Sequence, residues 1–240
     1  MIEKSMLEHS NILITGSSRG IGFATATAAL KHGAEKVVMV ARASSQFDYA
    51  VKQLKSLVND DNRVIAIQAD LSKSEGVAIV IQQLVELNIE IHHLVNNAGY
   101  TKPAPLHEAT IADFKMTMSV NVYAPFLLIQ QMMRLNFGLQ TIVNIASTAG
   151  IRGRPGWLSY SASKAALIAV SETLREELEP YGVNVVCLSP GRCATDLRKK
   201  LAPDEDPSTI MQPSQVSDVI MLSLSKLGRL VDSENIVVRT

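Results

Sequence analysis

Short runs of β-branched and aliphatic residues alternate along the chain with longer stretches in which apolar residues recur at helical spacing. The apolar runs predict strands at Asn11–Thr15, Lys36–Ala41, Arg63–Gln68, His92–Asn96, Thr141–Ala146, Val183–Leu188 and Asn235–Val238. The stretches between them predict helices at Ile21–His32, Phe47–Val58, Glu75–Asn88, Ile111–Asn136, Ser159–Tyr181 and Gln215–Lys226. Strands that alternate with helices indicate βαβ units. We therefore expect an α/β fold, a three-layer, doubly wound parallel sheet of about seven strands with helices on both faces.

The pattern predicts one domain. The 240 residues, of which 47% are hydrophobic, are enough for one large core, and the chain contains no internal repeat or low-complexity linker. We therefore assign residues 1–240 to a single domain. The one long segment without regular periodicity, residues 190–213, is expected to be a loop that shapes the substrate pocket, together with the loop after Ile151.

Composition excludes several classes of protein. Equal numbers of acidic and basic residues, 23 of each, argue against bulk electrostatic binding of nucleic acid. No apolar run approaches the ~20 residues that span a bilayer, and the N-terminus contains no apolar signal core. Cys187 and Cys193 do not make a disulfide framework, and the histidines show no metal-ligand spacing. We expect a cytoplasmic protein with no metal site and no nucleic-acid or membrane partner.

A glycine-rich turn follows the first predicted strand. The segment Gly16-Ser17-Ser18-Arg19-Gly20-Ile21-Gly22 lies between that strand and a helix, although its spacing differs from Gly-x-Gly-x-x-Gly. Glycines allow a tight turn and a close approach of the backbone to a pyrophosphate, and the helix N-terminus offers free amides and a positive dipole end. The turn indicates a dinucleotide site, with a plain strand-to-helix turn as the alternative.

The end of the second predicted strand bears on the choice of cofactor. An acidic residue at this point often holds the ribose 2′-hydroxyl of NAD, whereas an arginine accommodates the 2′-phosphate of NADP. Here the strand ends in Ala41 and Arg42, and Arg42 together with Arg19 could grip a phosphate. The pattern favours NADP over NAD, with two solvated arginines as the alternative.

Polar and small residues follow the third and fourth predicted strands. Asp70, followed by Leu71 and Ser72, could accept a hydrogen bond from an adenine amine or cap the next helix. The segment Asn96-Asn97-Ala98-Gly99 would let the backbone approach the cofactor ribose, or would form a tight turn. Asn121 lies inside a predicted helix, where Asn competes for backbone bonds, so it is either a buried polar group or an exposed residue.

A tyrosine and a lysine four residues apart follow the fifth predicted strand. Tyr160 and Lys164 share one face of a predicted helix, and Ser147 stands at the end of the strand before it. A free tyrosine has a pKa near ~10, and bringing it near neutrality takes roughly 4 kcal/mol. Lys164 could supply part of this as a neighbouring ammonium, and Ser147 part of it as a hydrogen-bond donor. A surface pair, with the lysine stem on the ring, is the alternative.

The ordered set of motifs resembles the short-chain dehydrogenase/reductase family, and among its members the 3-oxoacyl-(acyl carrier protein) reductases. The motifs run from Asn11 to about Thr195 and are Thr15-Gly16-x-x-x-Gly20-x-Gly22, Asp70, Asn96-Asn97-Ala98-Gly99, Asn121, Ser147, Tyr160-x-x-x-Lys164 and Pro190-Gly191-x-x-x-Thr195. The resemblance implies a Rossmann fold and NADP(H) as cofactor. It also implies a catalytic group of Asn121, Ser147, Tyr160 and Lys164.

The resemblance further implies a role for each of these residues. Tyr160 would be the general acid or base, Ser147 would hold and polarise the substrate oxygen, and Lys164 would bind the nicotinamide ribose and lower the tyrosine pKa. Asn121 would hold a water that relays protons through Lys164. Cofactor contacts are implied for Gly16, Ser18, Arg19, Gly20, Ile21, Gly22, Arg42, Asp70, Leu71, Asn97, Ala98, Gly99, Tyr160, Lys164, Pro190, Gly191 and Thr195.

The predicted activity is NADP(H)-dependent reduction of a carbonyl compound to a secondary alcohol, reversible as alcohol oxidation. One alternative is a catalytically idle, NADP(H)-binding sensor on the same fold. Another is a nucleotide-sugar epimerase or dehydratase, but such relatives need a longer substrate domain than this chain has room for.

Basic residues lie near the expected pocket mouth: Arg152, Arg154, Arg192, Arg198, Lys199 and Lys200. They would recruit an acidic substrate such as a phosphate, an acyl carrier or a nucleotide sugar, or they are ordinary surface charge. The acidic run Asp204-Glu205-Asp206 weakens the first interpretation. Trp157 and Cys193 could line the pocket or simply pack in their loops.

A homodimer or homotetramer is expected from the resemblance. Relatives usually pair through the surfaces of the helices predicted at Ile111–Asn136 and Ser159–Tyr181. The C-terminus departs from the family pattern because no Val-Asp-Gly-Gly-like segment follows the last predicted strand. The choice between dimer and tetramer therefore stays open.

Overall fold

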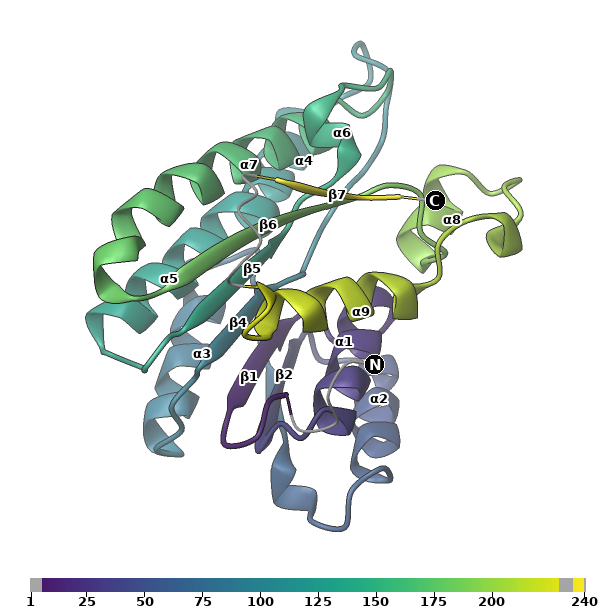
Figure 1. Cartoon of the computed structure of the whole chain (residues 1–240). Coiled ribbons are helices and arrows are strands. Elements are labelled where there is room, and N and C mark those ends of the chain that lie inside the picture. The colour runs from purple at the N-terminus through teal and green to yellow at the C-terminus, as the bar shows by residue number, and fades with distance from the viewer. Residues whose placement is uncertain (1–5, 229–234, 240) are drawn as a thin grey trace.

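A parallel sheet runs through the part of the chain that the computed structural model describes, residues 6–228 and 235–239 (Figure 1). Within these residues the strands are β1 (Asn11–Thr15), β2 (Lys36–Ala41), β3 (Val64–Gln68), β4 (His93–Asn96), β5 (Thr141–Ile145), β6 (Asn184–Pro190) and β7 (Ile236–Val238). They pair in the order β3-β2-β1-β4-β5-β6-β7, and every pair is parallel. The predicted strands and the doubly wound fold are confirmed.

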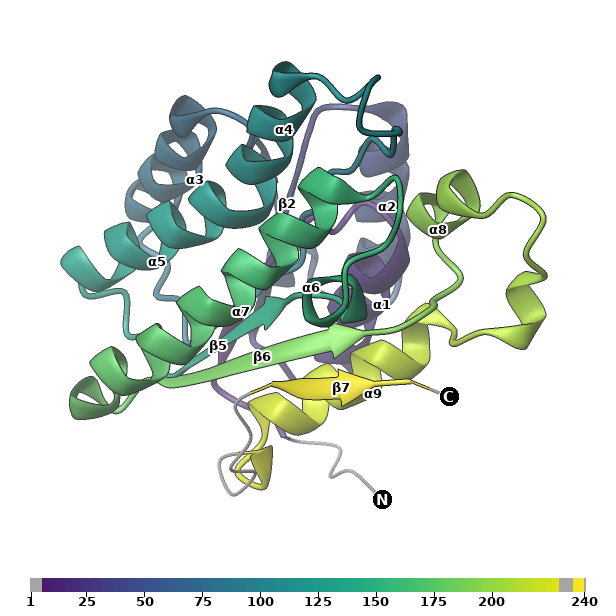
Figure 2. The same cartoon turned by 90° about the horizontal axis from the view of Figure 1, so that it is seen from above.

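Helices cover both faces of the sheet, as Figures 1 and 2 show from two directions. One face carries α1 (Gly20–Lys31), α2 (Ser45–Lys55) and α9 (Pro213–Leu224). The other face carries α3 (Ser74–Glu86), α4 (Ile111–Met118), α5 (Ala124–Arg134) and α7 (Leu158–Leu178). Each layer of helices buries its apolar stripe against the sheet, because neither element can shield its own hydrophobic face from water.

Strand β1 shows why the central strands are apolar at every position. Ile12 and Ile14 pack into the core on the α1 and α9 side, while Leu13 packs into the core on the α3 and α5 side. All three side chains are fully buried, because alternate residues of a strand point to opposite faces and both faces are covered. Each buried aliphatic side chain contributes about 1.5–3 kcal/mol of transfer free energy.

The direction of winding reverses at β1. The chain passes from β1 to β2 and β3 on one side, and then returns to place β4 on the other side of β1. Leu13 is paired with Val38 of β2 and with Leu94 of β4. In open parallel sheets, ligands bind at the carboxyl ends of the strands at such a switch point.

The helix predicted at Ile111–Asn136 is interrupted. The structure has α4, then a π-helical turn at Ser119–Tyr123, and then α5, which ends at Arg134. An α-helix would need an N–H from residue 125 for the carbonyl of Asn121, but residue 125 is proline and has none. The wider turn contains Asn121, and single π turns of this kind often occur at functional sites.

The segment between β6 and α9, predicted as a loop, contains two short helical elements that the prediction lacked. Strand β6 continues to Pro190, and the segment then forms α8 (Asp196–Leu201) and a 3₁₀ turn (Pro207–Thr209). Cys193 and Met211 form an isolated parallel bridge that brings its two ends together. Figure 2 shows α8 set apart from the sheet, beyond the carboxyl end of β6.

Candidate active site

A cavity of about 370 Å³ lies at the carboxyl ends of the central strands. Most of the residues that the sequence assigned to a site line this one cavity. They are Gly16, Ser18, Arg19, Gly20, Ile21, Arg42, Asp70, Leu71, Asn97, Ala98, Gly99, Ser147, Tyr160, Lys164, Pro190, Gly191 and Thr195. The fold thus brings segments from the whole length of the chain to one place.

The glycine-rich turn joins β1 to α1 at the wall of the cavity. No side chain caps α1 at Arg19, and Gly20 and Ile21 line the cavity beside the positive end of this helix. Gly22 was predicted to contact a cofactor, but it does not line the cavity. A Cβ atom at Gly22 would lie 2.4 Å from the carbonyl oxygen of Gly16, so this glycine lets the helix pack closely on the turn.

Two arginines and one carboxylate mark the end of the cavity near β2 and β3. Arg19, Arg42 and Asp70 all line it, and β2 ends at Ala41 without an acidic residue. Partial burial raises the pKa of Asp70, but hydrogen bonds from Ser72 and the charge of Arg42 outweigh this and hold its pKa below the usual value. The donors here suit a phosphate, and the charged carboxylate is a hydrogen-bond acceptor.

Ser147 and Tyr160 face one another across the other end of the cavity. Ser147 follows β5 and is the N-cap of the short helix α6 (Thr148–Ile151), where its Oγ accepts a hydrogen bond of 3.1 Å from the amide of Ala149. Tyr160 is on the first turn of α7 and is 8% exposed. Burial raises the pKa of Tyr160, and a hydrogen bond with the Ser147 side chain partly opposes this.

Lys164 lies one turn after Tyr160 and is buried. Its Nζ donates a hydrogen bond of 2.6 Å to the carbonyl of Ile145 and lies 5.8 Å from the centre of the Tyr160 ring. Burial lowers the pKa of Lys164 to about 8, because a desolvated ammonium is costly. The prediction of a lowered tyrosine pKa is wrong for the described structure, since the burial of Tyr160 outweighs its hydrogen bond with Ser147.

Helix α6 holds Ser147 close to α7. A Cβ atom at Gly150 would lie 2.6 Å from the backbone carbon of Lys164. Only glycine therefore lets the two helices come this close, and their approach sets the distance between Ser147 and Tyr160.

Asn121 is fully buried, as one of its two interpretations required, but it does not line the cavity. Its Oδ1 accepts a hydrogen bond of 2.8 Å from the amide of Tyr100, and its Nδ2 donates to the carbonyl of Tyr100 and to Oγ of Ser163. Ser163 in turn donates to the carbonyl of Tyr160. The Asn121 side chain therefore ties the segment after β4 to the start of α7.

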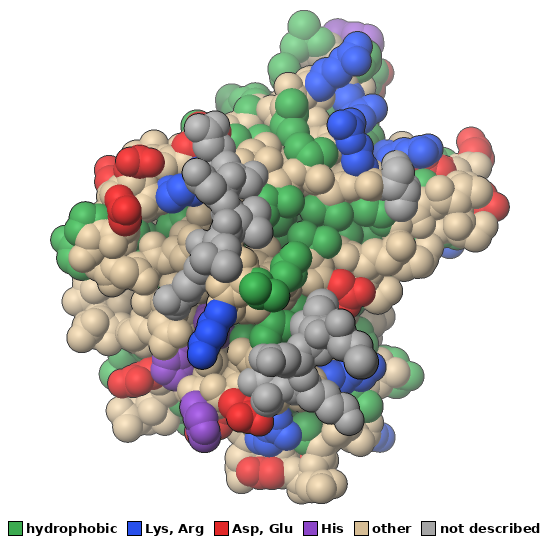
Figure 3. All heavy atoms as spheres, in the orientation of Figure 1, with side chains coloured by type: hydrophobic (Ala, Val, Ile, Leu, Met, Phe, Trp, Pro, Cys, Tyr) green, Lys and Arg blue, Asp and Glu red, His purple; other side chains and the backbone are tan. Residues whose placement is uncertain are grey.

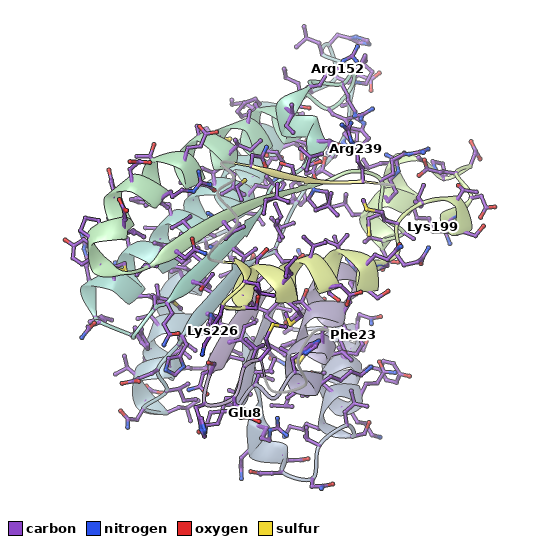
Figure 4. The ribbon with its side chains drawn as sticks, viewed as in Figure 1. Glu8, Phe23, Arg152, Lys199, Lys226 and Arg239 are labelled. Atoms are coloured by element: carbon purple, nitrogen blue, oxygen red, sulfur yellow. The ribbon has the colours of Figure 1, made fainter. Side chains whose placement is uncertain are left out.

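The predicted basic residues do not form one cluster. Figure 4 shows Arg152 and Lys199 well apart, one after α6 and the other on α8. Arg192 and Arg198 form ion pairs with Glu205, and the side chain of Lys200 lies outside the described part of the structure. Figure 3 likewise shows Asp and Glu side chains at the edge next to the blue Lys and Arg side chains. The acidic run thus neutralises part of the basic charge.

Trp157 and Cys193 both line the cavity. The rings of Trp157 and Tyr160 meet edge to face, with centroids 5.9 Å apart. Cys193 is buried, and burial raises the pKa of its thiol to about 11, so it remains a neutral thiol.

Sequence reasoning missed several residues that complete the cavity. Met116, Val120, Leu197 and Leu201 add apolar surface, and Asp196 adds a carboxylate. Two of them stand next to motif residues, since Val120 precedes Asn121 and Asp196 follows Thr195. No motif singles out Met116, Leu197 or Leu201.

Among the described residues, no group of three or more His, Cys, Asp or Glu side chains could hold a metal ion. None of the described helices is long and apolar enough to cross a membrane.

Comparison with known proteins identifies the class to which this fold and site belong. The model of the short chain dehydrogenase family matches residues 10–206. A 3-oxoacyl-(acyl-carrier-protein) reductase of Synechocystis sp. is 35% identical over 191 residues, which are 79% of this chain and 76% of that protein. A gluconate 5-dehydrogenase of Gluconobacter oxydans is 32% identical over 83% of this chain and 77% of its own length.

A solved structure agrees with the sequence comparisons. A short chain dehydrogenase of Burkholderia cenocepacia in complex with NADP superposes with a TM-score of 0.84 at 27% identity, covering 97% of each chain. The chain described here belongs to the short-chain dehydrogenase/reductase family. It is accordingly an oxidoreductase of the Rossmann fold.

Proposed function

We propose that the protein uses NADP(H) to reduce a ketone to a secondary alcohol, and can run the reaction in reverse, with Tyr160 as general acid or base. The observation that carries this proposal is the meeting of Ser147, Tyr160 and Lys164 at one end of the same cavity that has Arg19 and Arg42 at its other end. A proton donor and a phosphate-binding pair in one cavity suit a reaction between a nicotinamide dinucleotide and a carbonyl.

The residues of the cavity fit NADP(H). The turn before α1 would hold the pyrophosphate, Asp70 would accept from the adenine amine, and Arg19 and Arg42 would hold the 2′-phosphate. Asn97-Ala98-Gly99 and Lys164 would hold the ribose on the nicotinamide side, and Pro190, Gly191 and Thr195 would flank the nicotinamide. When bound, the reduced cofactor supplies the hydride. The NADP complex of the Burkholderia cenocepacia relative supports this choice.

The chain's own residues supply orientation and a proton. Ser147 would donate a hydrogen bond to the carbonyl oxygen and hold it beside Tyr160. The carbonyl carbon gains the hydride, and Tyr160 gives its phenolic proton to the oxygen, so that one alcohol forms from one ketone, one hydride and one proton. The raised pKa of Tyr160 keeps this proton in place until it is needed. A protonated Lys164 would then stabilise the resulting phenolate.

Asn121 would help to return a proton to Tyr160 after Tyr160 has given its own to the substrate. Its side-chain amide is already bonded to Tyr100 and Ser163, so its backbone carbonyl is the group we assign to a relay water. That carbonyl lies in the π-helical turn. It receives no α-helical hydrogen bond from residue 125, because residue 125 is proline and has no N–H.

The substrate subgroup we propose is a 3-oxoacyl thioester or a similar ketone, by analogy with the Synechocystis reductase. The segment of residues 190–213 and Trp157 would define its pocket. The gluconate 5-dehydrogenase makes a sugar acid the competing possibility.

The test is oxidation of NADPH and of NADH against 3-oxoacyl thioesters, diketones, quinones, keto sugars and ketosteroids, followed at the nicotinamide absorbance. We expect turnover with NADPH and with one of these classes. Tyr160→Phe should bind NADPH as the wild type does and lose about 10²–10⁴-fold in turnover. Tight NADPH binding without turnover on any class would favour the idle sensor instead.

We also propose that the protein is a homodimer or homotetramer. Large apolar side chains are exposed on α4, the π-helical turn, α5 and α7, namely Ile111, Tyr123, Phe126 and Leu158. Figure 3 shows another hydrophobic band across the centre of the face that carries β7 and α9. The mass in solution from light scattering tests this proposal, and a monomer at micromolar concentration would contradict it.

A further inference from the structure

Glu205 holds two arginines of the segment that closes the substrate end of the cavity. Its carboxylate accepts from Nε of Arg198 at 2.5 Å and from Nη2 of Arg198 at 2.8 Å, which is a two-point contact along one edge of the guanidinium. It also accepts from Nη1 of Arg192 at 3.1 Å. The side chains of Glu205 and Arg198 are only 15% and 20% exposed, so solvent screens this contact weakly.

The same arginine covers the aromatic side chain beside the proposed proton donor. The guanidinium carbon of Arg198 lies 6.0 Å from the centre of the Trp157 ring, and Trp157 meets Tyr160 edge to face. Arg198 and Trp157 both line the cavity. Arg198 is therefore part of the wall next to the position where a carbonyl would react, whereas its partner Glu205 does not line the cavity.

One of the two edges of Arg198 that could grip an anion, the Nε and Nη2 edge, is already taken. A carboxylate or phosphate binds arginine best through two parallel N–H groups, and Glu205 occupies Nε and Nη2. The carboxylate of Glu205 also offsets part of the positive charge of Arg198. The pKa of Glu205 is lowered to about 2, chiefly by its hydrogen bond with Arg198, so it stays charged at all ordinary pH values.

Apolar side chains make up much of the remaining wall on this side, although the guanidinium carbon of Arg154 also lies 6.0 Å from the centre of the Trp157 ring. The segment of residues 190–213 carries four basic and four acidic residues and so has no formal net charge. The side chains that α4, the π-helical turn and α8 add to the wall include Met116, Val120, Leu197 and Leu201. Such a wall excludes water and favours an apolar group.

We infer that Arg198, held by Glu205, makes the substrate end select uncharged ketones whose apolar part lies against Trp157, and reject ketones that carry a carboxylate or phosphate near the carbonyl. This inference rests on the proposed function and names the class of its substrate. Arg198 is thus a specificity-determining residue, and Glu205 determines whether Nε and Nη2 of Arg198 are free to bind an anion.

Trp157 is the only tryptophan of the chain, so its fluorescence reports binding at this wall without any need for turnover. The experiment titrates the protein, in the presence of NADP⁺, with 4-oxooctanoate and with its methyl ester. The two probes share the same ketone and differ in charge. We expect the wild type to bind the ester at least about tenfold more tightly than the carboxylate.

Substitution of the acid should remove this preference. Glu205→Gln and Glu205→Ala free the edge of Arg198, and we expect the ratio of the two affinities to fall by about tenfold. Asp204→Asn removes the same charge from an exposed neighbour that pairs with neither arginine, and it should leave the ratio unchanged. Adding Arg198→Met to Glu205→Gln should restore the preference for the ester. The double variant no longer has the guanidinium that Glu205→Gln made available to the carboxylate of the probe.

The results separate this inference from the proposed function. Equal binding of both probes by the wild type, no binding of either, or a ratio that Glu205→Gln and Glu205→Ala leave unchanged would overturn the inference. Reduction of both probes is measured in parallel with NADPH. If the two probes bind as expected but no carbonyl is reduced, the proposed activity would be overturned. The role of Arg198 and Glu205 in selecting uncharged ketones would still stand.

Discussion

Nη1 of Arg19 lies 3.4 Å from Oδ2 of Asp196, so an ion pair links the glycine-rich turn after β1 to the first residue of α8. Both residues line the cavity, and their side chains are about half exposed. Arg19 is one of the two arginines assigned to the 2′-phosphate. Asp196 therefore competes with that phosphate for the same guanidinium.

Asp196→Asn should bind NADPH more tightly than the wild type, because Arg19 is then free for the phosphate. Exposed ion pairs are worth up to about 1 kcal/mol, so a gain of about two- to fivefold is expected, and it should shrink as salt is added. Titration of the NADPH fluorescence measures it. Asp218→Asn, on the exposed side of α9, is the matched control. An equal gain for NADH would show that the 2′-phosphate is not what Asp196 opposes.

Arg42→Asp should move the cofactor preference toward NADH. The carboxylate would repel the 2′-phosphate and could accept from the ribose 2′-hydroxyl, as an acidic residue does at this place in NAD-binding sheets. The expected loss in kcat/KM for NADPH is at least about tenfold, with an equal or higher value for NADH. Arg152→Asp, which changes an arginine that does not line the cavity, should leave the preference as it is. If Arg42→Asp also leaves the cofactor preference unchanged, Arg42 does not bind the 2′-phosphate.

Gly150→Ala should disturb the active site through the contact between α6 and α7. The added methyl group would lie 2.6 Å from the backbone of Lys164, so one of the two helices must shift. We expect a loss of about 1–3 kcal/mol in the free energy of unfolding and a larger fall in kcat than in NADPH affinity. Gly153→Ala is the control, since nothing lies within 4 Å of its Cβ position. Equal effects of the two substitutions would argue against this positioning role.

Lys164→Met should change the way stability depends on pH. The pKa of Lys164 is lowered to about 8 in the folded protein from an ordinary value of 10.5. Between these values the unfolded chain binds more protons than the folded one, so this lysine makes the wild type more stable as pH rises through that range. The stability of Lys164→Met relative to wild type should therefore fall by up to about 3 kcal/mol as pH rises from about 7 to 10.5.

Chemical denaturation of both proteins at several pH values measures this difference. Lys199→Met, which changes an exposed lysine on α8, should show no comparable trend. A difference between Lys164→Met and wild type that does not vary with pH would mean that Lys164 is not held at a lowered pKa.

The order and kind of the elements follow from local pattern. Ile12, Leu13 and Ile14 predict a strand buried on both faces, and the structure places them in two cores on opposite sides of the sheet. The predicted boundaries of β1 and β2 agree with the structure at both ends. Prediction fails where apolar periodicity is not the deciding signal. Pro125, four residues after Asn121, interrupts a periodic helix, and α8, capped by the side chain of Thr195, forms in a segment whose pattern predicted a loop.

The sequence by itself determined the parallel sheet, the residues at its carboxyl ends, and the placing of Ser147, Tyr160 and Lys164 in one cavity. These follow from side-chain periodicity and from the rule that parallel strands end at the same edge. Only the tertiary structure decided which charges meet. Arg19 pairs with Asp196, and Glu205 occupies Arg198. It also decided that burial raises the pKa of Tyr160 and lowers that of Lys164. Charge pairing and desolvation depend on distances and burial that no spacing along the chain encodes.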